Sequence, residues 1–323
     1  MHKIIWNITK KCGFRCRVCG TQSDGRRELS YGEKKKVLTE ICSFKEEISE
    51  LDFAGGDPLF DKESREIIRE AIDILGREKV SVTTTGVGVA QLSTEEKNKY
   101  LYRCEFSLDD IGNCDSRIRG ENLYSIKNLK AVQECWKYIH RLTINVPIFE
   151  TETGLDDLKH LVCCINKINV ENLSVNILRY MPVGKVKLCD YPKAYFPERY
   201  IDYIKQNIRS DIEVSIHCAM RGIKDINDNC GLLIKKVGID CAGNIYMCAW
   251  AGYLQEDKER NPFYLGNALE QNLASLLKTK RAIEVQNNLK KNCKCCCIFS
   301  YLYSETHDMF SNQDPLFKSK LCN

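Results

Sequence analysis

Short apolar runs alternate with longer amphipathic runs through the first two thirds of the chain. The short runs are rich in β-branched and aromatic residues and are predicted as strands; they lie at residues 3–9, 50–53, 79–83, 103–107, 142–148, 173–178 and 213–216. The longer runs repeat apolar residues three and four positions apart and are predicted as helices; they lie at residues 30–48, 62–75, 94–102, 124–139, 155–168 and 196–208. This alternation indicates a parallel sheet covered by helices. About six units are too few for a closed eight-stranded barrel, so we expect an α/β fold with a partial (β/α)6 TIM-like barrel over residues 1–215, with its chemistry where strands end.

The pattern changes after about residue 211. Two segments that flank Gly243 predict a β-hairpin, and two later segments predict helices; they lie at residues 233–240, 244–248, 269–278 and 281–289. No repeat or low-complexity linker separates this part from the rest. We therefore expect a small C-terminal β-hairpin/helix domain at residues 216–323, docked onto the barrel.

Composition places the chain among ordinary folded proteins. Its 323 residues are 43% hydrophobic and 28% charged, which argues against disorder. The formal net charge of +4 is weak, so we expect no nucleic-acid partner, which would call for a clustered basic face. The apolar stretches are too short to span a membrane, and the first residues lack the order of a signal peptide. We therefore expect a cytoplasmic protein with no membrane partner.

Cysteine is over-represented, with 19 in the chain. An odd number cannot pair completely within one chain, and in a cytosolic protein of this size ligation of a metal or cluster is a better interpretation than disulfides. Three cysteines are bunched near the N-terminus and seven lie between residues 230 and 297. Most of those between are expected to be small apolar core residues; they are Cys42, Cys104, Cys114, Cys135, Cys163, Cys164, Cys189 and Cys218.

The N-terminal cysteines Cys12, Cys16 and Cys19 have the spacing C-x3-C-x2-C, directly after the first predicted strand. Three thiolates on one tight loop can hold three irons of a [4Fe–4S] cube and leave the fourth iron open to a ligand. A zinc knuckle is the alternative. It needs a fourth ligand, and none lies close by, because His2 precedes the strand and the next cysteine is Cys42.

This cysteine pattern, together with segments after the later strands, resembles the radical S-adenosylmethionine (SAM) superfamily. Gly55-Gly56-Asp57-Pro58 follows the second predicted strand, where that family has a GGEP-like segment. The resemblance implies that backbone carbonyls and nearby polar atoms of this segment hold the amino group of SAM. Two positions depart from the family: Asp57 replaces the usual Glu, and Val18 stands where an aromatic residue often lies against the adenine.

The resemblance extends to the ends of the third, fourth and sixth predicted strands. It implies a role in binding SAM for Thr85, Ser107, Asp109, Arg119 and Leu178. In particular, it implies that the Ser107 hydroxyl lies near the ribose or carboxylate, that Arg119 pairs with the methionyl carboxylate, and that the adenine packs near Leu178. A guanidinium fork suits a carboxylate geometrically.

The chemistry that the resemblance implies is reductive cleavage of SAM. One electron, from a donor such as flavodoxin or ferredoxin, releases methionine and a 5′-deoxyadenosyl radical that takes hydrogen from a substrate carbon. The cofactor carries the organic chemistry, and the protein positions the radical and keeps water away.

The C-terminal cysteines resemble the twitch form of the SPASM domain, and their spacing is similar to that of aminocyclitol dehydrogenases. Cys230 and Cys248 flank Gly243, and Cys293 and Cys296 form a C-x2-C pair. The resemblance implies one auxiliary [4Fe–4S] cluster on these four thiols. Alternative ligands remain open at Cys241, Cys295, Cys297 and Cys322, and a four-cysteine zinc ribbon is the alternative kind of site.

Three functions follow as hypotheses. The first is oxidative maturation of a ribosomally made peptide by crosslinking or epimerisation, for which Cys218 is a candidate hydrogen donor. The second is dehydrogenation or rearrangement of a small alcohol, sugar or aminocyclitol. The third is a zinc-binding scaffold without catalysis. We expect net oxidative chemistry, because a second cluster can accept the electron that the substrate radical must lose, whereas zinc is redox-inert.

Overall fold

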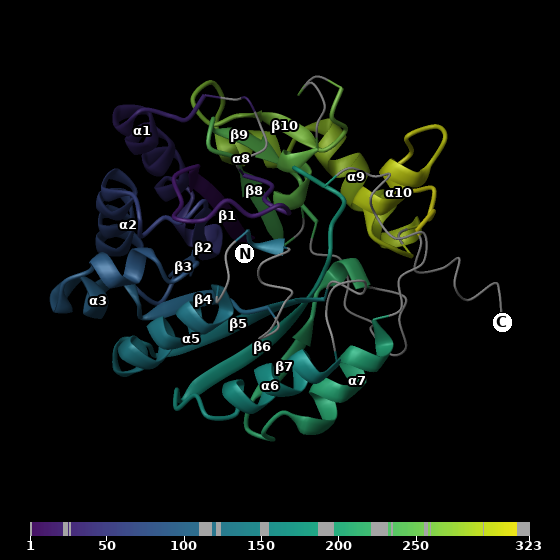
Figure 1. Ribbon diagram of the computed structural model, residues 1–323. Helices are drawn as coiled ribbons and strands as arrows, with labels where there is room; N and C mark the ends of the chain where they lie inside the picture. The colour runs from purple at the N-terminus through teal and green to yellow at the C-terminus, as the bar shows by residue number, and fades with distance from the viewer. Residues whose placement is uncertain are drawn as a thin grey trace.

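The computed structural model describes residues 2–21, 25, 27–109, 118–120, 124–148, 155–186, 197–220, 232–233, 235–254, 258, 260–292 and 294–314. Within them the strands form one sheet of ten strands in the order β10-β9-β8-β1-β2-β3-β4-β5-β6-β7 (Figure 1). The strands are β1 His2–Thr9, β2 Ile48–Gly55, β3 Val80–Thr84, β4 Arg103–Ser107, β5 Arg141–Ile148, β6 Asn172–Arg179, β7 Glu213–Ile216, β8 Lys236–Ile239, β9 Asn244–Tyr246 and β10 Tyr264–Asn267. The described strands leave the sheet open, with β7 at one edge and β10 at the other.

Strands β1 to β7 are parallel and neighbour one another in chain order. A helix follows each of the first six strands: α1 Tyr31–Cys42, α2 Lys62–Leu75, α3 Thr94–Tyr100, α5 Tyr124–Cys135, α6 Leu155–Ile165 and α7 Glu198–Asn207. The predicted α/β class and the partial (β/α)6 barrel are confirmed.

The predicted C-terminal hairpin is formed by β8 and β9 and continues the barrel sheet. β8 pairs in parallel with β1, with Lys236 opposite Lys3 and Ile239 opposite Trp6, and β9 and β10 follow antiparallel. Gly243 makes the turn at a φ of 80°, in the left-handed region that favours glycine. The C-terminal region is therefore hydrogen-bonded onto the first strand of the barrel, and a domain boundary near residue 215 stays a prediction.

Two helix predictions differ from the structure. The helix predicted over residues 30–48 is α1, which ends at Cys42; a 3-10 helix, η1 Lys45–Glu47, follows, and β2 begins at Ile48. Ser30 caps the start of α1 and forms a reciprocal capping box with Glu33. In the C-terminal part, α8 Leu273–Leu277 and α9 Lys280–Asn292 confirm two predicted helices, whereas α10 Cys297–Tyr303 was not predicted.

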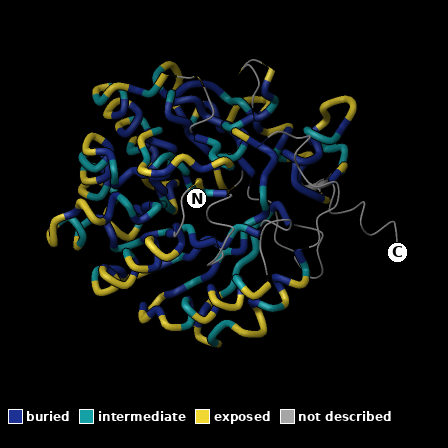
Figure 2. Tube along the Cα trace, viewed as in Figure 1, coloured by how far each residue is buried: buried dark blue, intermediate teal, exposed yellow. Residues whose placement is uncertain are grey.

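Alternate residues of each barrel strand face opposite sides. In β1, Ile4, Trp6 and Ile8 are fully buried in the main hydrophobic core, whereas Lys3 and Asn7 line a cavity on the other face. Figure 2 shows the result, a buried sheet inside helices whose outer sides are exposed. One face of the sheet therefore packs against helices, and its inner face is left for polar chemistry.

The described cysteines are all free thiols. Cys104 and Cys135 are buried in the core, as expected for scattered cysteines, whereas Cys163 is exposed. Cys114 and Cys189 lie outside the described residues. Among the described helices, none combines the length and apolar character needed to cross a membrane.

Candidate functional site

A cavity of about 390 Å³ opens on the inner face of the sheet, where the barrel strands end. Most of the residues singled out in the sequence line it: Cys12, Cys16, Cys19, Gly55, Gly56, Thr85, Ser107, Arg119, Leu178, Cys218 and Cys248. Asp57, Pro58 and Asp109 are buried. The structure therefore places the three N-terminal cysteines and two later ones, Cys218 and Cys248, around one cavity.

Backbone contacts from two other segments and one contact within the loop hold the residues that carry Cys12, Cys16 and Cys19. The Arg17 N–H donates to the carbonyl of Ile118 at 2.8 Å, and the Lys185 N–H donates to the carbonyl of Cys19 at 3.3 Å. Phe14 donates its N–H to the Cys12 sulfur at 3.4 Å. Burial raises the pKa of Cys12 to about 11, so a positive group such as a metal cluster is needed before this thiol ionises near neutral pH.

The double glycine lies against the start of the cysteine loop. The Gly56 and Asp57 N–H groups donate to the carbonyls of Thr9 and Lys11, both at 2.7 Å. A Cβ at Gly55 would lie 2.4 Å from the Thr9 oxygen, and one at Gly56 would lie 2.2 Å from the Lys11 oxygen. Only glycine permits this approach of two backbones, which is the physical reason for the Gly-Gly pair.

Asp57 braces the ends of β2 and β3. Its Oδ1 accepts from the Thr84 hydroxyl at 2.9 Å and the Leu59 N–H at 3.1 Å. Its Oδ2 accepts from the Thr85 hydroxyl at 2.6 Å and the Gly88 N–H at 3.2 Å. Asp57 is fully buried, and Thr85, predicted to bind SAM, is engaged with it. The role of Asp57 in binding SAM stays a prediction, and the sequence did not show that Asp57 connects this segment to the next strand.

Arg119 and Asp109 form a fork-to-carboxylate pair at the cavity wall. Arg119 donates from Nη2 to Asp109 Oδ1 at 2.6 Å and from Nε to Oδ2, and Asp109 is fully buried. The guanidinium stacks 4.5 Å from the Tyr124 ring centre, and Nη1 lies 3.9 Å from the Cys16 sulfur. One edge of Arg119 is thus held by Asp109, and Nη1 faces the cysteine loop.

An aromatic residue from another element lies beside Val18. Val18 packs with Ile118 and Tyr180 in a small cluster, and Tyr180 follows β6 directly and lines the cavity beside Leu178. Ser107 also lines the cavity, while its backbone carbonyl accepts from Asn128 at 2.8 Å.

A second group of thiols lies around β9, η5 and α10. Cys248 precedes the 3-10 helix η6 Ala249–Tyr253, Cys218 begins η5 Cys218–Met220, and Cys296 is the N-cap residue of α10. Burial raises the pKa of Cys248 to about 12, with a further contribution from Cys218. Cys218 acts in the same direction on the buried Cys296 thiol. Cys218 therefore lies within electrostatic range of both Cys248 and Cys296.

The remaining candidate auxiliary ligands are distributed as follows. Cys230, Cys293 and Cys322 lie outside the described residues. Cys241 and Cys297 are buried. The Cys295 sulfur lies 3.0 Å from the Ser300 hydroxyl. The choice of Cys296 over Cys295 and Cys297 as a ligand stays a prediction.

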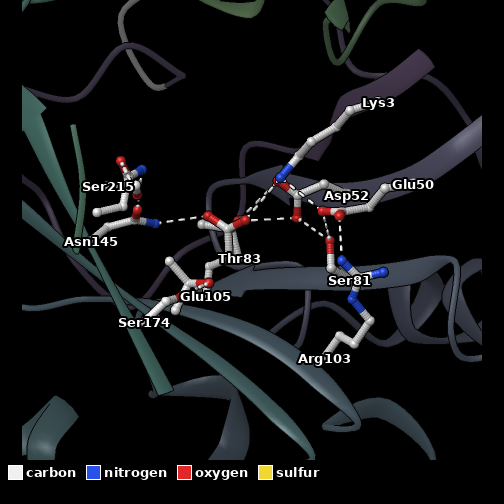
Figure 3. Close-up of polar contacts among 12 residues, drawn as sticks. Lys3, Glu50, Asp52, Ser81, Thr83, Arg103, Glu105, Asn145, Ser174 and Ser215 are labelled. Carbon is white, nitrogen blue, oxygen red and sulfur yellow. Dashed lines mark hydrogen bonds and ion pairs between the residues drawn. The ribbon is translucent and has the colours of Figure 1, made fainter. Parts of the chain in front are cut away.

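Sequence reasoning did not single out a network of charged and polar side chains on the inner face of the barrel (Figure 3). The Lys3 ammonium lies 2.8 Å from Glu50 Oε1, 2.9 Å from Glu105 Oε1 and 3.7 Å from Asp52 Oδ2, and Arg103 pairs with Glu50. Hydroxyls and amides continue the network across the sheet: Ser81, Thr83, Asn145, Asn176 and Ser215. An alternation of polar residues with the core positions of each strand was the sequence signal for this layer.

Burial and nearby charges give the three carboxyl groups of this layer different pKa values. Burial raises the pKa of Asp52 to about 7, and Glu105 and Glu50 add to this while Lys3 opposes it. Burial also acts upward on the pKa of Glu50, but Lys3 and Arg103 outweigh it and hold that pKa at about 2. The pKa of Glu105 is lowered because Lys3 and Asn145 outweigh its burial. Asp52 is therefore the carboxyl without an adequate countercharge.

His217 and Trp250 form another pair in the cavity wall that was not predicted. The Trp250 indole N–H donates to His217 Nε2 at 3.2 Å, and both residues line the cavity. Because an indole nitrogen can only donate, the neutral His217 ring carries its proton on Nδ1. Nδ1 is buried and has no hydrogen-bond partner in the described part of the chain.

Cys12, Cys16 and Cys19 are the candidate ligands of an iron–sulfur cluster. Among the described residues, no three His, Cys, Asp or Glu side chains are grouped closely enough to hold one metal ion. Cys12, Cys16 and Cys19 line the cavity as separate thiols on one loop, the arrangement needed when each binds a different iron of a cube.

Comparison with known families gives matches in the same two regions. Residues 4–138 match the family described as a 4Fe-4S single cluster domain, and residues 230–297 match SPASM, an iron–sulfur cluster-binding domain. GTP 3',8-cyclase of Staphylococcus haemolyticus is 23% identical over 215 residues, which cover 64% of this chain and 62% of the cyclase. The chain thus spans less than two thirds of the length of that relative.

Two solved structures share the fold. Streptococcus suis SuiB bound to its precursor peptide SuiA superposes with a TM-score of 0.69 at 17% identity, covering 96% of this chain and 74% of SuiB. A structure of anSMEcpe with bound AdoMet and the Cp18Cys peptide has a TM-score of 0.56 at 16% identity, covering 96% and 87% of the two chains.

Proposed function

Because this chain belongs to the radical SAM superfamily and carries a C-terminal SPASM domain, we propose that it abstracts hydrogen from a substrate carbon during oxidative maturation of a peptide. One observation carries this proposal: Cys12, Cys16 and Cys19 line the same 390 Å³ cavity as Cys218 and Cys248. A substrate held there lies between a site that generates a radical and a site that can accept an electron.

At the first site, Cys12, Cys16 and Cys19 hold the [4Fe–4S] cluster that binds SAM. When bound, these groups supply the radical chemistry. The carbonyls of Gly55 and Gly56 receive the amino group, and the close contact of this segment with the cysteine loop fixes their direction.

The rest of the SAM pocket is provided by the strand ends. Arg119, oriented by Asp109, presents Nη1 toward the cofactor carboxylate. Ser107 meets the polar part of SAM, and Leu178 and Tyr180 pack against the adenine. In this arrangement Tyr180 replaces the aromatic residue that Val18 does not provide.

At the second site, Cys248 and Cys296, with Cys230 and Cys293, hold the auxiliary [4Fe–4S] cluster. The place of Cys218 beside Cys248 and Cys296 favours a role at this cluster over hydrogen donation. Crosslinking is accordingly favoured over epimerisation, which needs a hydrogen donor.

A peptide is favoured as substrate by the two structural neighbours, which are described with bound peptides. A small molecule is the second candidate, since the sequence relative is named for its action on GTP and the C-terminal spacing resembles that of aminocyclitol dehydrogenases. A flavodoxin or ferredoxin is the electron donor that we propose.

The test of the first site is anaerobic SAM cleavage with dithionite as reductant. Replacing Cys12, Cys16 and Cys19 with Ala should abolish 5′-deoxyadenosine formation. The matched control replaces Cys42, Cys163 and Cys164, which do not line the cavity, and should keep it. Cleavage by the first variant at the rate of the control refutes the assignment.

The test of the second site uses metal analysis and then substrate. The variant without Cys12, Cys16 and Cys19 should retain about four irons, as expected for one cube. Zinc in place of these irons would favour a zinc ribbon and a protein that acts as a scaffold without catalysis. Cys248→Ala and Cys296→Ala should still cleave SAM but form no product from a peptide that the wild type modifies. Normal product formation by either variant would remove the electron-acceptor role.

A further inference from the structure

Arg179 stands at the junction of three segments that carry cysteines. It ends β6, and its Nη1 donates at 2.8 Å to the carbonyl of Ala219, the residue after Cys218. Its guanidinium carbon lies 3.4 Å from the ring centre of Phe299, one turn into the helix that Cys296 caps. It thereby contacts both η5 and α10.

Asp314 completes this junction from the C-terminal part of the chain. Arg179 donates to Asp314 Oδ2 at 2.8 Å from Nη1 and to Oδ1 at 2.7 Å from Nη2. Both side chains are fully buried. Such a pair is costly to remove from water, and replacing it by apolar residues is often neutral or stabilising in other proteins. Its presence beside the cavity therefore calls for a role other than stability.

We propose that the Arg179–Asp314 pair positions the auxiliary cysteines Cys218 and Cys296 and tunes the reduction potential of the cluster that they surround. This inference rests on the proposed function, because it concerns the auxiliary site assigned there. Arg179 acts as a positioning residue: it connects the backbone beside Cys218 to the first turn of α10 through one rigid, planar group.

The charges of the pair act in opposite directions on this site. Both charges lie beside the segments that carry Cys218 and Cys296, because Arg179 contacts the Ala219 carbonyl and the Phe299 ring and pairs with Asp314. A nearby cation stabilises the more negative, reduced form of a cluster, and a nearby anion destabilises it; net charge and hydrogen bonds to sulfur are established determinants of such potentials. The two charges therefore have opposite effects on the reduction potential, and single substitutions can measure each effect separately.

The experiment uses the full chain with Cys12, Cys16 and Cys19 replaced by Ala, so that only the auxiliary site is left to hold a cluster. In this background Arg179→Gln should lower the midpoint potential measured by EPR-monitored titration, and Asp314→Asn should raise it. The double variant, in which neutral amides replace both charges, should return toward the parent. A purely structural role would not produce shifts of opposite sign.

Arg209→Gln and Asp211→Asn are the matched controls. Arg209 and Asp211 form an exposed pair at 2.6 Å, so these substitutions should change neither the iron content nor the midpoint potential. If a single variant fails to fold, the double variant still decides the matter: it should fold, hold about four irons, and show an EPR signal broader than the parent because the cysteine-bearing segments are less well fixed.

The outcomes separate this inference from the proposed function. No iron in the parent background refutes the auxiliary cluster itself, and the inference with it. Iron in the parent, combined with single variants whose potentials are unchanged or shift in the same direction, overturns the inference alone. A double variant whose EPR signal is as narrow as that of the parent overturns the positioning role.

Discussion

Substitution of Asp57 by Asn is a sharp test of how the SAM-binding motif is held. Each carboxylate oxygen accepts one hydroxyl and one backbone N–H: Oδ1 from Thr84 and Leu59, and Oδ2 from Thr85 and Gly88. An amide nitrogen in place of either oxygen would face a backbone N–H that cannot become an acceptor. A neighbouring hydroxyl can rotate, but one backbone donor is left unsatisfied in either orientation of the amide.

The magnitude follows from this count. An unsatisfied buried donor costs about 1–3 kcal/mol, and the hydrogen bonds that remain weaken because their acceptor loses its charge. The expected loss is about 2–4 kcal/mol in the free energy of unfolding. At about 2 °C per kcal/mol for a large domain, the melting temperature should fall by roughly 4–8 °C.

The assay is thermal melting of the protein without cluster or SAM, which separates the brace from cofactor binding. Asp73→Asn is the matched control, because Asp73 is exposed and pairs with Lys99 at the surface; it should melt within about 1 °C of the wild type. Melting of Asp57→Asn at the temperature of the control would refute the reasoning. After cluster assembly, SAM affinity should also fall, since Gly56 precedes the brace.

Two further predictions concern charged groups in the cavity. Asp52→Asn removes a carboxyl whose pKa is raised from 3.8 to about 7 by burial; the stability from such a group is fully present below its unfolded pKa and is lost as the pH rises through 7. The melting temperature of this variant, relative to wild type, should therefore increase between pH 5 and pH 8, and parallel pH curves would contradict this. Arg119→Lys keeps the positive charge but loses the guanidinium fork that holds both oxygens of buried Asp109. It should lower the free energy of unfolding by about 1–3 kcal/mol and weaken SAM binding in isothermal titration. If neither quantity changes, a point charge is sufficient at this position.

The fold and the first cysteine site could be predicted because their signals are local in sequence. Periodicity identifies a strand or helix from its own residues, so β4 and β7 were predicted to the residue. The spacing of Cys12, Cys16 and Cys19 reflects the reach of a single loop, and the strand ends bring Gly55 and Ser107 to the same edge because the strands are parallel. α1 was predicted too long because Phe44 and Ile48 continue its three- and four-residue apolar spacing, although Lys45–Glu47 form a separate 3-10 helix.

The features that sequence reasoning missed depend on pairs of residues far apart in the chain. Arg179 and Asp314 are separated by 135 positions, and neither belongs to a pattern that identifies the other. An Arg at the end of an apolar strand signals a buried charge, but its partner is decided by where the C-terminal segment packs. The pairing of β8 with β1 has the same character, because its partners Lys3 and Lys236 are 233 positions apart in the chain. Motif spacing therefore indicates which chemistry the chain carries, whereas the groups that orient that chemistry and set its electrostatics emerge only when the distant segments are packed together.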